Sequence, residues 1–306
     1  MGDTVTGFDS LESLEQGFRG QGYIADRALL TPLFLMTRLG RPLLLEGHAG
    51  VGKTETAKVL ARLLDTELIR LQCYEGLDAA NTLYEWNYQR QLLSIRLHEA
   101  GQGGTAENTP EGVDALERHI FGPEFLLERP LLKAIRAEHA PAVLLIDEVD
   151  RADEEFEAFL LELLSDFQIS IPELGTVRAK HPPLVILTSN RVRELSDALK
   201  RRCLYHWIGY PDFERELEIV RGRVEGIGPQ LARQVVQVVQ ALRDLHLEKP
   251  PGVAETLDWA IALLALGRTA LDEAAMEETM GCVLKTTGDF EILRARLADL
   301  AAAGAV

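Results

Sequence analysis

The chain has 306 residues, of which 46% are hydrophobic, enough for one large domain or for a medium-sized domain with a small one appended. Its formal net charge of -16 repels nucleic acid and anionic membrane surfaces at long range. Three widely spaced cysteines argue against a disulfide framework or a zinc site, and the apolar stretches are too short to cross a bilayer, so we expect a cytoplasmic protein outside the membrane.

Short apolar, β-branched runs alternate with longer helical patterns through the first two thirds of the chain, which is typical of a parallel α/β sheet. The expected strands are Leu43–Leu45, Leu68–Gln72, Ala142–Ile146, Leu184–Thr188 and Leu204–Ile208. The interval between the second and third strands is far longer than one crossover needs, so we expect an insertion at about 74–130. Part of it, Gly101–Gly112, is rich in Gly, Thr, Asn and Pro and indicates a mobile loop.

Only helical patterns follow residue 209. The sequence therefore predicts an α/β domain at 1–209 and a small all-α domain at 210–306.

The first expected strand leads directly into a glycine-rich loop, and a helical pattern follows at 55–64. The loop matches G-x-x-x-x-G-K-[ST] in full, through Gly47, His48, Ala49, Gly50, Val51, Gly52, Lys53 and Thr54. Such a backbone can wrap a phosphate closely, with N–H groups and a helix N-terminus facing the charge. We expect Lys53 to reach the β- and γ-phosphates of ATP and Thr54 to ligate Mg²⁺. A glycine-rich turn with an incidental lysine is the alternative.

Two carboxylates, Asp147 and Glu148, follow the third expected strand. Carboxylates at the end of a buried strand are costly unless a cation or water lies there. We expect Asp147 to bind Mg²⁺ through water and Glu148 to polarise the attacking water as general base. The alternative is an ordinary strand that ends in a solvated acidic turn.

Asn190 follows the fourth expected strand in the same way. Its amide offers a donor and an acceptor in one side chain, which suits a residue that orients the attacking water between Glu148 and the γ-phosphate. By itself, an asparagine after a strand is more often a turn residue.

Together with the arginine pair Arg201 and Arg202 and the helical C-terminal region, these motifs resemble an AAA+ ATPase. The resemblance implies a P-loop α/β domain with a five-stranded parallel sheet and a small all-α lid domain. More closely, the stretches Gly22–Asp26, Leu39–Lys53 and Cys73–Arg96 are similar to the MoxR family, and within it to the CoxD-like branch linked to maturation of carbon-monoxide dehydrogenase.

The resemblance implies further roles. Tyr23 and Ile24 would lie against the adenine base. The insertion at Tyr74–Arg96 and a hairpin at Gln168–Arg178 would face a ring pore or a client, although internal packing of Tyr84, Trp86 and Tyr88 and an ordinary hairpin remain open.

The cations before the fifth strand fall where AAA+ proteins place the residue that reaches a neighbouring subunit's nucleotide. The resemblance favours Arg202 as this finger and implies a supporting or interface role for Arg201, and the choice between the two arginines stays open. A guanidinium there pairs with γ-phosphate oxygens as charge spreads in the transition state. A solvated helix end remains the plain alternative for Lys200.

The lid departs from the family in one place. Members commonly carry an arginine that touches the γ-phosphate in a Gly-x-x-x-Arg-like context, whereas Gly252–Thr256 here contains Glu255. A carboxylate cannot stabilise phosphate charge.

The resemblance implies an Mg²⁺-ATP-dependent remodelling ATPase or chaperone in a homo-oligomeric, hexameric ring. Its client would be a metalloenzyme of the molybdenum-hydroxylase class, and its helper a protein with a von Willebrand factor A (VWA) domain. A nucleic-acid motor or loader is an alternative that the net charge disfavours. A weakly hydrolysing, nucleotide-gated binding module is another, suggested by Glu255.

Overall fold

The computed structural model of the chain describes residues 8–78, 82–101, 116–171 and 175–297. Within these residues the chain forms two compact units that alternate along the sequence. Unit 1 contains Leu35–Leu44 and Leu64–Tyr205; unit 2 contains Phe8–Phe34, Leu45–Leu63 and the chain from His206 onward. The boundary at residue 209 stays a prediction. Every helix among the described residues falls short of the length and apolar character needed to cross a membrane.

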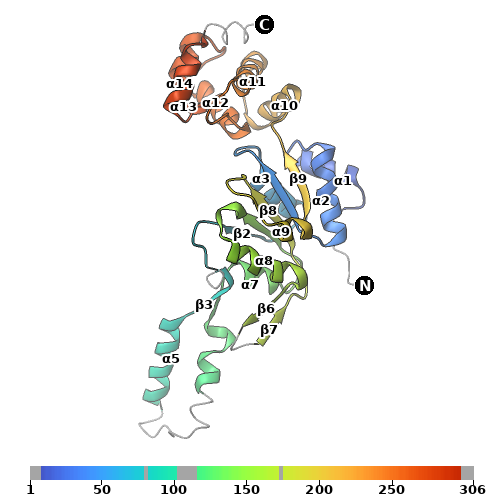
Figure 1. Ribbon diagram of the computed structural model, residues 1–306, viewed down its shortest axis with the longest axis vertical. Coiled ribbons are helices and arrows are strands. Elements are labelled where there is room, and N and C mark those ends of the chain that lie inside the picture. The colour runs from blue at the N-terminus through green and yellow to red at the C-terminus, as the bar shows by residue number, and fades with distance from the viewer. Residues whose placement is uncertain (1–7, 79–81, 102–115, 172–174, 298–306) are drawn as a thin grey trace. The chain divides into compact units, whose positions relative to one another are not determined.

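Five strands form the central sheet, and all five were expected from the sequence, with small shifts at their ends (Figure 1). They are β1 (Leu43–Gly47), β2 (Leu68–Gln72), β5 (Val143–Asp147), β8 (Leu184–Ser189) and β9 (Leu204–Ile208). Their order is β2-β5-β8-β1-β9, and β5 pairs in parallel with β2 and β8. Strands β1, β5 and β8 are buried at every position, which explains why they appear as unbroken apolar runs. The predicted α/β fold class is confirmed.

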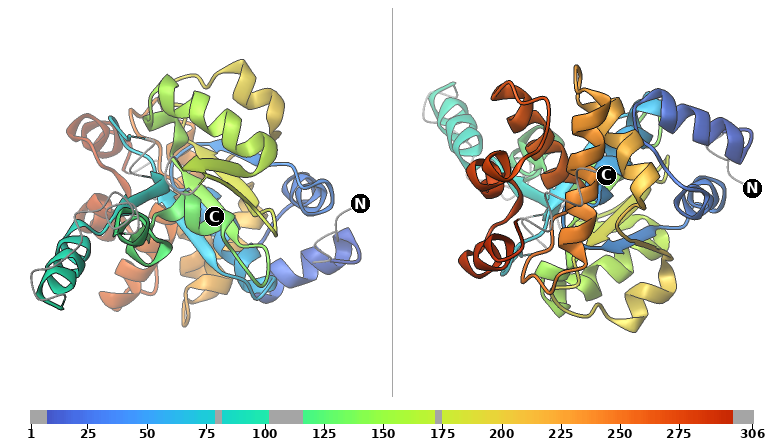
Figure 2. Two further views of the ribbon diagram at one scale, coloured as in Figure 1. Left: turned by 90° about the horizontal axis from the view of Figure 1, so that it is seen from below. Right: turned by 90° about the horizontal axis from the view of Figure 1, so that it is seen from above.

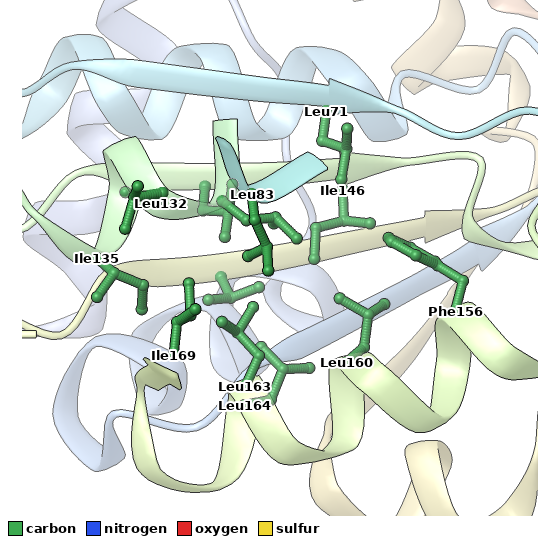
Figure 3. Close-up of a cluster of buried hydrophobic side chains, with 14 of the residues drawn as sticks. Leu71, Leu83, Leu132, Ile135, Ile146, Phe156, Leu160, Leu163, Leu164 and Ile169 are labelled. Atoms are coloured by element: carbon green, nitrogen blue, oxygen red, sulfur yellow. The ribbon is translucent and has the colours of Figure 1, made fainter. Parts of the chain in front are cut away.

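The core of unit 1 lies between this part of the sheet and helices α7 (Pro130–Ile135) and α8 (Glu154–Asp166). In Figure 3, Phe156, Leu160 and Leu163 of α8 project into the same cluster as Ile146 of β5. Helix α8 begins where Asp153 accepts a hydrogen bond from the Phe156 N–H, which satisfies one of the free donors at a helix start.

The insertion forms β3 (Tyr84–Trp86), α5 (Tyr88–Gly101), a short 3-10 helix η1 (Pro123–Phe125) and β4 (Leu126–Glu128), which pairs antiparallel with β3. Figure 1 shows α5 extending away from the sheet of unit 1. Trp86 is buried and packs edge-on against Phe121, whereas Tyr88 is 64% exposed. The interpretation of these aromatic residues as internal packing is therefore correct for Trp86 but not for Tyr88. The predicted mobile loop lies, from residue 102, outside the described residues.

The expected hairpin is present as β6 (Gln168–Ile171) and β7 (Gly175–Arg178), which pair antiparallel. The turn between them lies outside the described residues.

Unit 2 contains a bundle of helices in its C-terminal part, the lid. The lid helices are α10 (Phe213–Arg223), α11 (Pro229–Arg243), α12 (Val253–Ala265), α13 (Glu273–Val283) and α14 (Thr287–Arg294). Figure 2 shows them side by side in orange to red, around a core that includes Val235, Trp259 and Met276. Helices α1 (Leu11–Gly20) and α3 (Lys53–Leu63) belong to the same unit, α2 (Arg27–Leu39) begins in it, and α9 (Asp197–Arg202) belongs to unit 1.

A buried ion pair joins two lid helices. Arg243 of α11 donates through Nη1 and Nη2, both at 2.7 Å, to the two oxygens of Glu216 in α10. The Thr256 hydroxyl and the Gln240 amide donate to the same carboxylate, each at 2.7 Å. With Glu216 fully buried and its acceptors occupied, loss of one partner leaves an uncompensated charge inside the lid.

We therefore expect Arg243→Ala to lower the free energy of unfolding of the lid by about 3–5 kcal/mol. Arg268→Ala is the control, because Arg268 pairs with Glu278 at the surface, where a salt bridge contributes about 1 kcal/mol or less. Urea unfolding followed by circular dichroism measures both. Equal destabilisation by the two substitutions would contradict the expectation.

Cysteine reactivity gives a second check on the packing. Burial raises the pKa of Cys73 to about 12, helped by the charges of Asp147, Asp150 and Glu148, and burial also raises the pKa of Cys203 to about 12. Both side chains therefore remain thiols at pH 8, and a thiol is far less nucleophilic than a thiolate. Cys282 is only partly buried.

We expect a maleimide reagent at pH 8 to modify Cys282 quickly and the other two cysteines only after denaturation. Mass spectrometry of timed samples gives the stoichiometry, and Cys282→Ser should remove the fast modification. Rapid labelling of Cys73 in the folded protein would show that the core of unit 1 opens.

Candidate phosphate-binding loop and hydrolytic residues

The glycine-rich loop joins the end of β1 to the start of α3 within unit 2. Gly50 and Gly52 have φ angles of +75° and +97°, a region that favours glycine. A Cβ on Gly50 would lie 2.8 Å from the Glu255 carboxylate oxygen Oε2. The loop thus needs glycine both for its backbone path and for the close approach of its neighbours.

Lys53 begins α3 and is 6% exposed. Its Nζ donates to the carbonyl oxygens of Gly47 at 2.8 Å and His48 at 2.7 Å, which holds the ammonium group inside the loop. Positive charge, a glycine backbone and a helix N-terminus converge here, and this combination fits the phosphates of a nucleotide.

Tyr23 lies against the loop, where its hydroxyl forms hydrogen bonds with Thr56 Oγ1 at 2.8 Å and with the Gly52 carbonyl at 3.4 Å. Burial raises the pKa of Tyr23, although the bond to Thr56 opposes this shift. Arg215 of α10 donates to the Ile24 carbonyl at 3.0 and 3.2 Å. The segment that carries Tyr23 and Ile24 is thus tied to both α3 and the lid, and its contact with an adenine base stays a prediction.

The lid reaches the same loop through the start of α12. The Ala254 N–H donates to the Gly50 carbonyl at 3.1 Å, and a Cβ on Gly252 would lie 2.7 Å from the Ala49 carbonyl oxygen. Glu255 Oε2 accepts the Gly252 N–H at 3.0 Å, so this side chain caps its own helix. The carboxylate that stands in place of the family's arginine therefore has a local structural role.

His48 connects the loop to the lid by a second route. Its ring stacks on Tyr210 with centroids 4.8 Å apart and an interplanar angle of 6°. The guanidinium of Arg243, which pairs with Glu216, lies over the Tyr210 ring at 4.4 Å from its centroid. A residue of the phosphate-binding motif is thereby linked to the buried ion pair of the lid.

Asp147 ends β5 in unit 1 and is 2% exposed. Its Oδ1 accepts the Thr188 hydroxyl at 2.5 Å, and its Oδ2 accepts Arg70 Nε at 3.0 Å and Nη2 at 2.5 Å. These bonds fix the orientation of the Asp147 carboxylate. Carboxylate oxygens are hard donors, the kind that Mg²⁺ prefers, so Asp147 fits this ion.

Glu148 adopts a left-handed backbone conformation with φ +55°. Its N–H donates to Thr188 Oγ1 at 2.9 Å, and its Oε2 pairs with Arg151 Nε at 2.7 Å. The side chain is 29% exposed, which leaves it accessible to water. A non-glycine residue with this φ is strained, and such strain concentrates at functional sites.

Asn190 follows β8 and lies in the same unit as the acidic pair. Its N–H donates to Asp150 Oδ2 at 3.1 Å. Thr188 and Asp150 thus connect Asp147, Glu148 and Asn190 into one hydrogen-bonded region at the ends of β5 and β8.

Arg201 and Arg202 lie in the last turn of α9, and both are exposed. Arg202 Nε donates to Ser165 Oγ of α8 at 2.8 Å. The Arg201 carbonyl accepts from Arg41 at 2.9 Å, and among the described residues its guanidinium has no hydrogen bond or ion pair. Of the two, Arg202 has the more fixed side chain.

Sequence reasoning missed Arg70, Arg151, Thr188 and Asp150. Arg70 is a cation in the expected strand β2; it lies opposite Leu145 of the neighbouring strand β5, two positions before Asp147, and its long side chain reaches that carboxylate. Thr188 is the first of two polar residues that end an otherwise apolar strand. The pairing of Arg151 with Glu148 has a weaker signal, a spacing of three residues.

Comparison with known proteins agrees with these features. Residues 42–203 match the AAA domain family of the dynein-related subfamily. The denitrification regulatory protein NirQ of Pseudomonas aeruginosa is 25% identical over 72% of this chain and 74% of its own length. The gas vesicle ATPase GvpN of Haloferax mediterranei is 26% identical over 67% of this chain and 57% of its own length.

Among solved structures, the RuvB Holliday junction branch migration motor of Thermotoga maritima is similar, with 16% identity, a TM-score of 0.46 and coverage of 97% of this chain and 80% of that chain.

NirQ and GvpN are AAA+ ATPases of the MoxR family, which agrees with the resemblance to that family; nothing specifically supports the CoxD-like branch. The match covers the nucleotide-binding motifs and more than half of the chain. This chain therefore belongs to the AAA domain family, dynein-related subfamily, and is a nucleotide-binding AAA+ ATPase.

Proposed function

We propose that the chain hydrolyses ATP with Mg²⁺ and uses the energy to remodel a protein client. The observation that carries the proposal is Lys53, buried at the start of α3 inside a complete glycine-rich loop. The acidic pair and Asn190 at the ends of β5 and β8 support hydrolysis rather than binding alone.

Each residue has a defined task in this proposal. The N–H groups of the loop and Lys53 bind the phosphates, and Thr54 and Asp147 hold Mg²⁺, which neutralises phosphate charge when bound. Glu148 accepts a proton from the attacking water at its carboxylate, and Asn190 orients that water. Arg202 acts on the nucleotide of a neighbouring copy, which requires an oligomer.

The test is steady-state ATP hydrolysis with Mg²⁺ and with an excess of EDTA. We expect turnover that depends on Mg²⁺, and loss of nucleotide binding in Lys53→Ala. Nucleotide binding is followed with a fluorescent ATP analogue. If wild-type protein binds no nucleotide, the proposal is wrong.

We also propose that the protein works as a homo-oligomeric, hexameric ring with a VWA-domain helper and a metalloenzyme client. The exposed arginines at the end of α9 support the ring, because they offer positive charge to a neighbouring copy in a protein that is otherwise acidic. Helix α5 supports a client-facing insertion, because several of its large hydrophobic side chains are exposed. They are Tyr88, Leu92, Leu93 and Leu97.

Size-exclusion chromatography of Glu148→Gln protein with ATP, with and without a candidate helper, tests this assembly. A slowly hydrolysing variant should hold the nucleotide-bound oligomer long enough to elute as one. A monomer under every condition would count against the ring.

A further inference from the structure

Asp150 is a buried carboxylate that the proposed chemistry does not use. It is 1% exposed and lies in the short 3-10 helix η2 (Val149–Arg151) that directly follows Glu148. A charged group is seldom buried without a purpose, because desolvation is costly unless hydrogen bonds offset it.

The bonds that offset its burial come from the Asn190 loop. Oδ2 of Asp150 accepts the N–H of Asn190 at 3.1 Å and the N–H of Val192 at 2.7 Å. Between them Arg191 has φ +59°, so the two amides turn toward one point. Successive N–H groups around a left-handed residue form a concave anion-binding turn. The anion of this turn is Asp150 itself.

The far end of the loop is held separately. The Ser196 N–H donates to Glu157 Oε2 at 2.9 Å, and Arg193 pairs with the other oxygen of Glu157. The Asp150 bonds hold the N–H groups of Asn190 and Val192, and the Arg191 N–H between them donates to Ser189 Oγ at 3.0 Å.

Asp150 is also rigidly connected to Glu148. The Arg151 N–H donates to the Glu148 carbonyl at 3.0 Å, and this bond closes a turn that contains both Glu148 and Asp150. One side of this turn carries the general base, and the other holds the loop that carries Asn190.

We propose that Asp150 is a positioning residue that fixes Asn190 relative to Glu148, so that base and water-orienting amide keep one geometry. The inference rests on the proposed hydrolytic function. A small misplacement of a catalytic group can cost about 10²-fold in rate. Loss of Asp150 should therefore lower kcat more than it weakens nucleotide binding.

The structure suggests a conservative substitution. Oδ1 of Asp150 has no hydrogen-bond partner among the described residues. Asp150→Asn can keep an oxygen acceptor for both N–H groups and put its amide nitrogen where no bond is lost. Asp150→Glu keeps the charge but moves the oxygens by one methylene. Position of the acceptor, rather than charge, should decide the activity.

The experiment measures kcat, KM and nucleotide affinity for Asp150→Ala, Asp150→Asn and Asp150→Glu. We expect Asp150→Ala and Asp150→Glu to lower kcat about 10- to 100-fold with KM changed less than about threefold, and Asp150→Asn to stay within about threefold of wild type. If Asp150→Ala does not fold, the difference in kcat between Asp150→Asn and Asp150→Glu still tests the positioning role.

A double-mutant cycle separates positioning from general stability. If Asp150 acts through Asn190, then Asp150→Ala combined with Asn190→Ala should lose no more than Asn190→Ala alone. Losses that multiply would overturn the proposal, as would wild-type kcat in Asp150→Ala.

Asp289 provides the matched control. It is 1% exposed in the lid and likewise accepts two backbone N–H groups, that of Glu248 at Oδ1 (2.8 Å) and that of Lys249 at Oδ2 (3.2 Å). Asp289→Ala should lower the melting temperature and leave kcat per folded molecule unchanged. If the wild-type protein binds ATP but never hydrolyses it, the proposed function is contradicted and the inference about Asp150 falls with it. If the wild type hydrolyses ATP normally and Asp150→Ala has the same kcat, only the positioning role is contradicted.

Discussion

Glu148→Gln should bind ATP as tightly as the wild type and hydrolyse it about 10²- to 10⁴-fold more slowly. The amide cannot accept a proton from the attacking water, yet it keeps the size of the carboxylate. The Thr188 bond to the backbone N–H of residue 148 does not depend on the side chain and should hold the turn in place. Binding and hydrolysis should therefore separate in this one substitution.

Single-turnover hydrolysis and equilibrium binding, measured on the same preparation, check the expectation. Glu155→Gln is the control, because Glu155 is an exposed acidic residue in the first turn of α8. Wild-type turnover in Glu148→Gln would remove Glu148 from the role of general base.

Arg202→Ala should retain nucleotide binding and lose hydrolysis, by about 10³- to 10⁵-fold if Arg202 acts as an arginine finger. The guanidinium acts on developing phosphate charge, which is absent when the nucleotide merely binds. Because the finger serves a neighbouring copy, an inactive Arg202→Ala subunit still has a complete site of its own.

Mixing Arg202→Ala with Glu148→Gln subunits should therefore restore part of the activity. The Glu148→Gln subunits supply an intact Arg202 to neighbours whose own Glu148 is intact. The rate is measured across mixing ratios, with Arg201→Ala in parallel as the test of the adjacent arginine. No recovery at any ratio would mean that the finger is another residue or that it acts within its own subunit.

The strands and the phosphate-binding loop could be predicted because their signals are local. A strand buried on both faces must be apolar throughout, and a loop that wraps phosphate needs glycine at fixed positions. The charge pairs could not be predicted in this way. Arg70 and Asp147 are far apart in sequence, and only the pairing of β2 with β5 brings them together.

The aromatic residues of the insertion show a different limit. Trp86 and Tyr88 are two positions apart and similar in hydrophobic character, yet one is buried and the other exposed. Trp86 ends β3 and packs against Phe121, which lies far downstream in the sequence, whereas Tyr88 begins the next element, α5. Asp150 was overlooked for a related reason, since the amides that bind it come from the loop after β8.

The contact between Gly50 and Gly252 alters how a motif in this chain should be interpreted. The two backbones lie so close that a Cβ on Gly252 would come within 3.0 Å of Gly50 Cα. Gly252 is thus required for steric reasons, whichever residue follows it in the lid. The contact between the two backbones is therefore enough to explain a glycine at position 252.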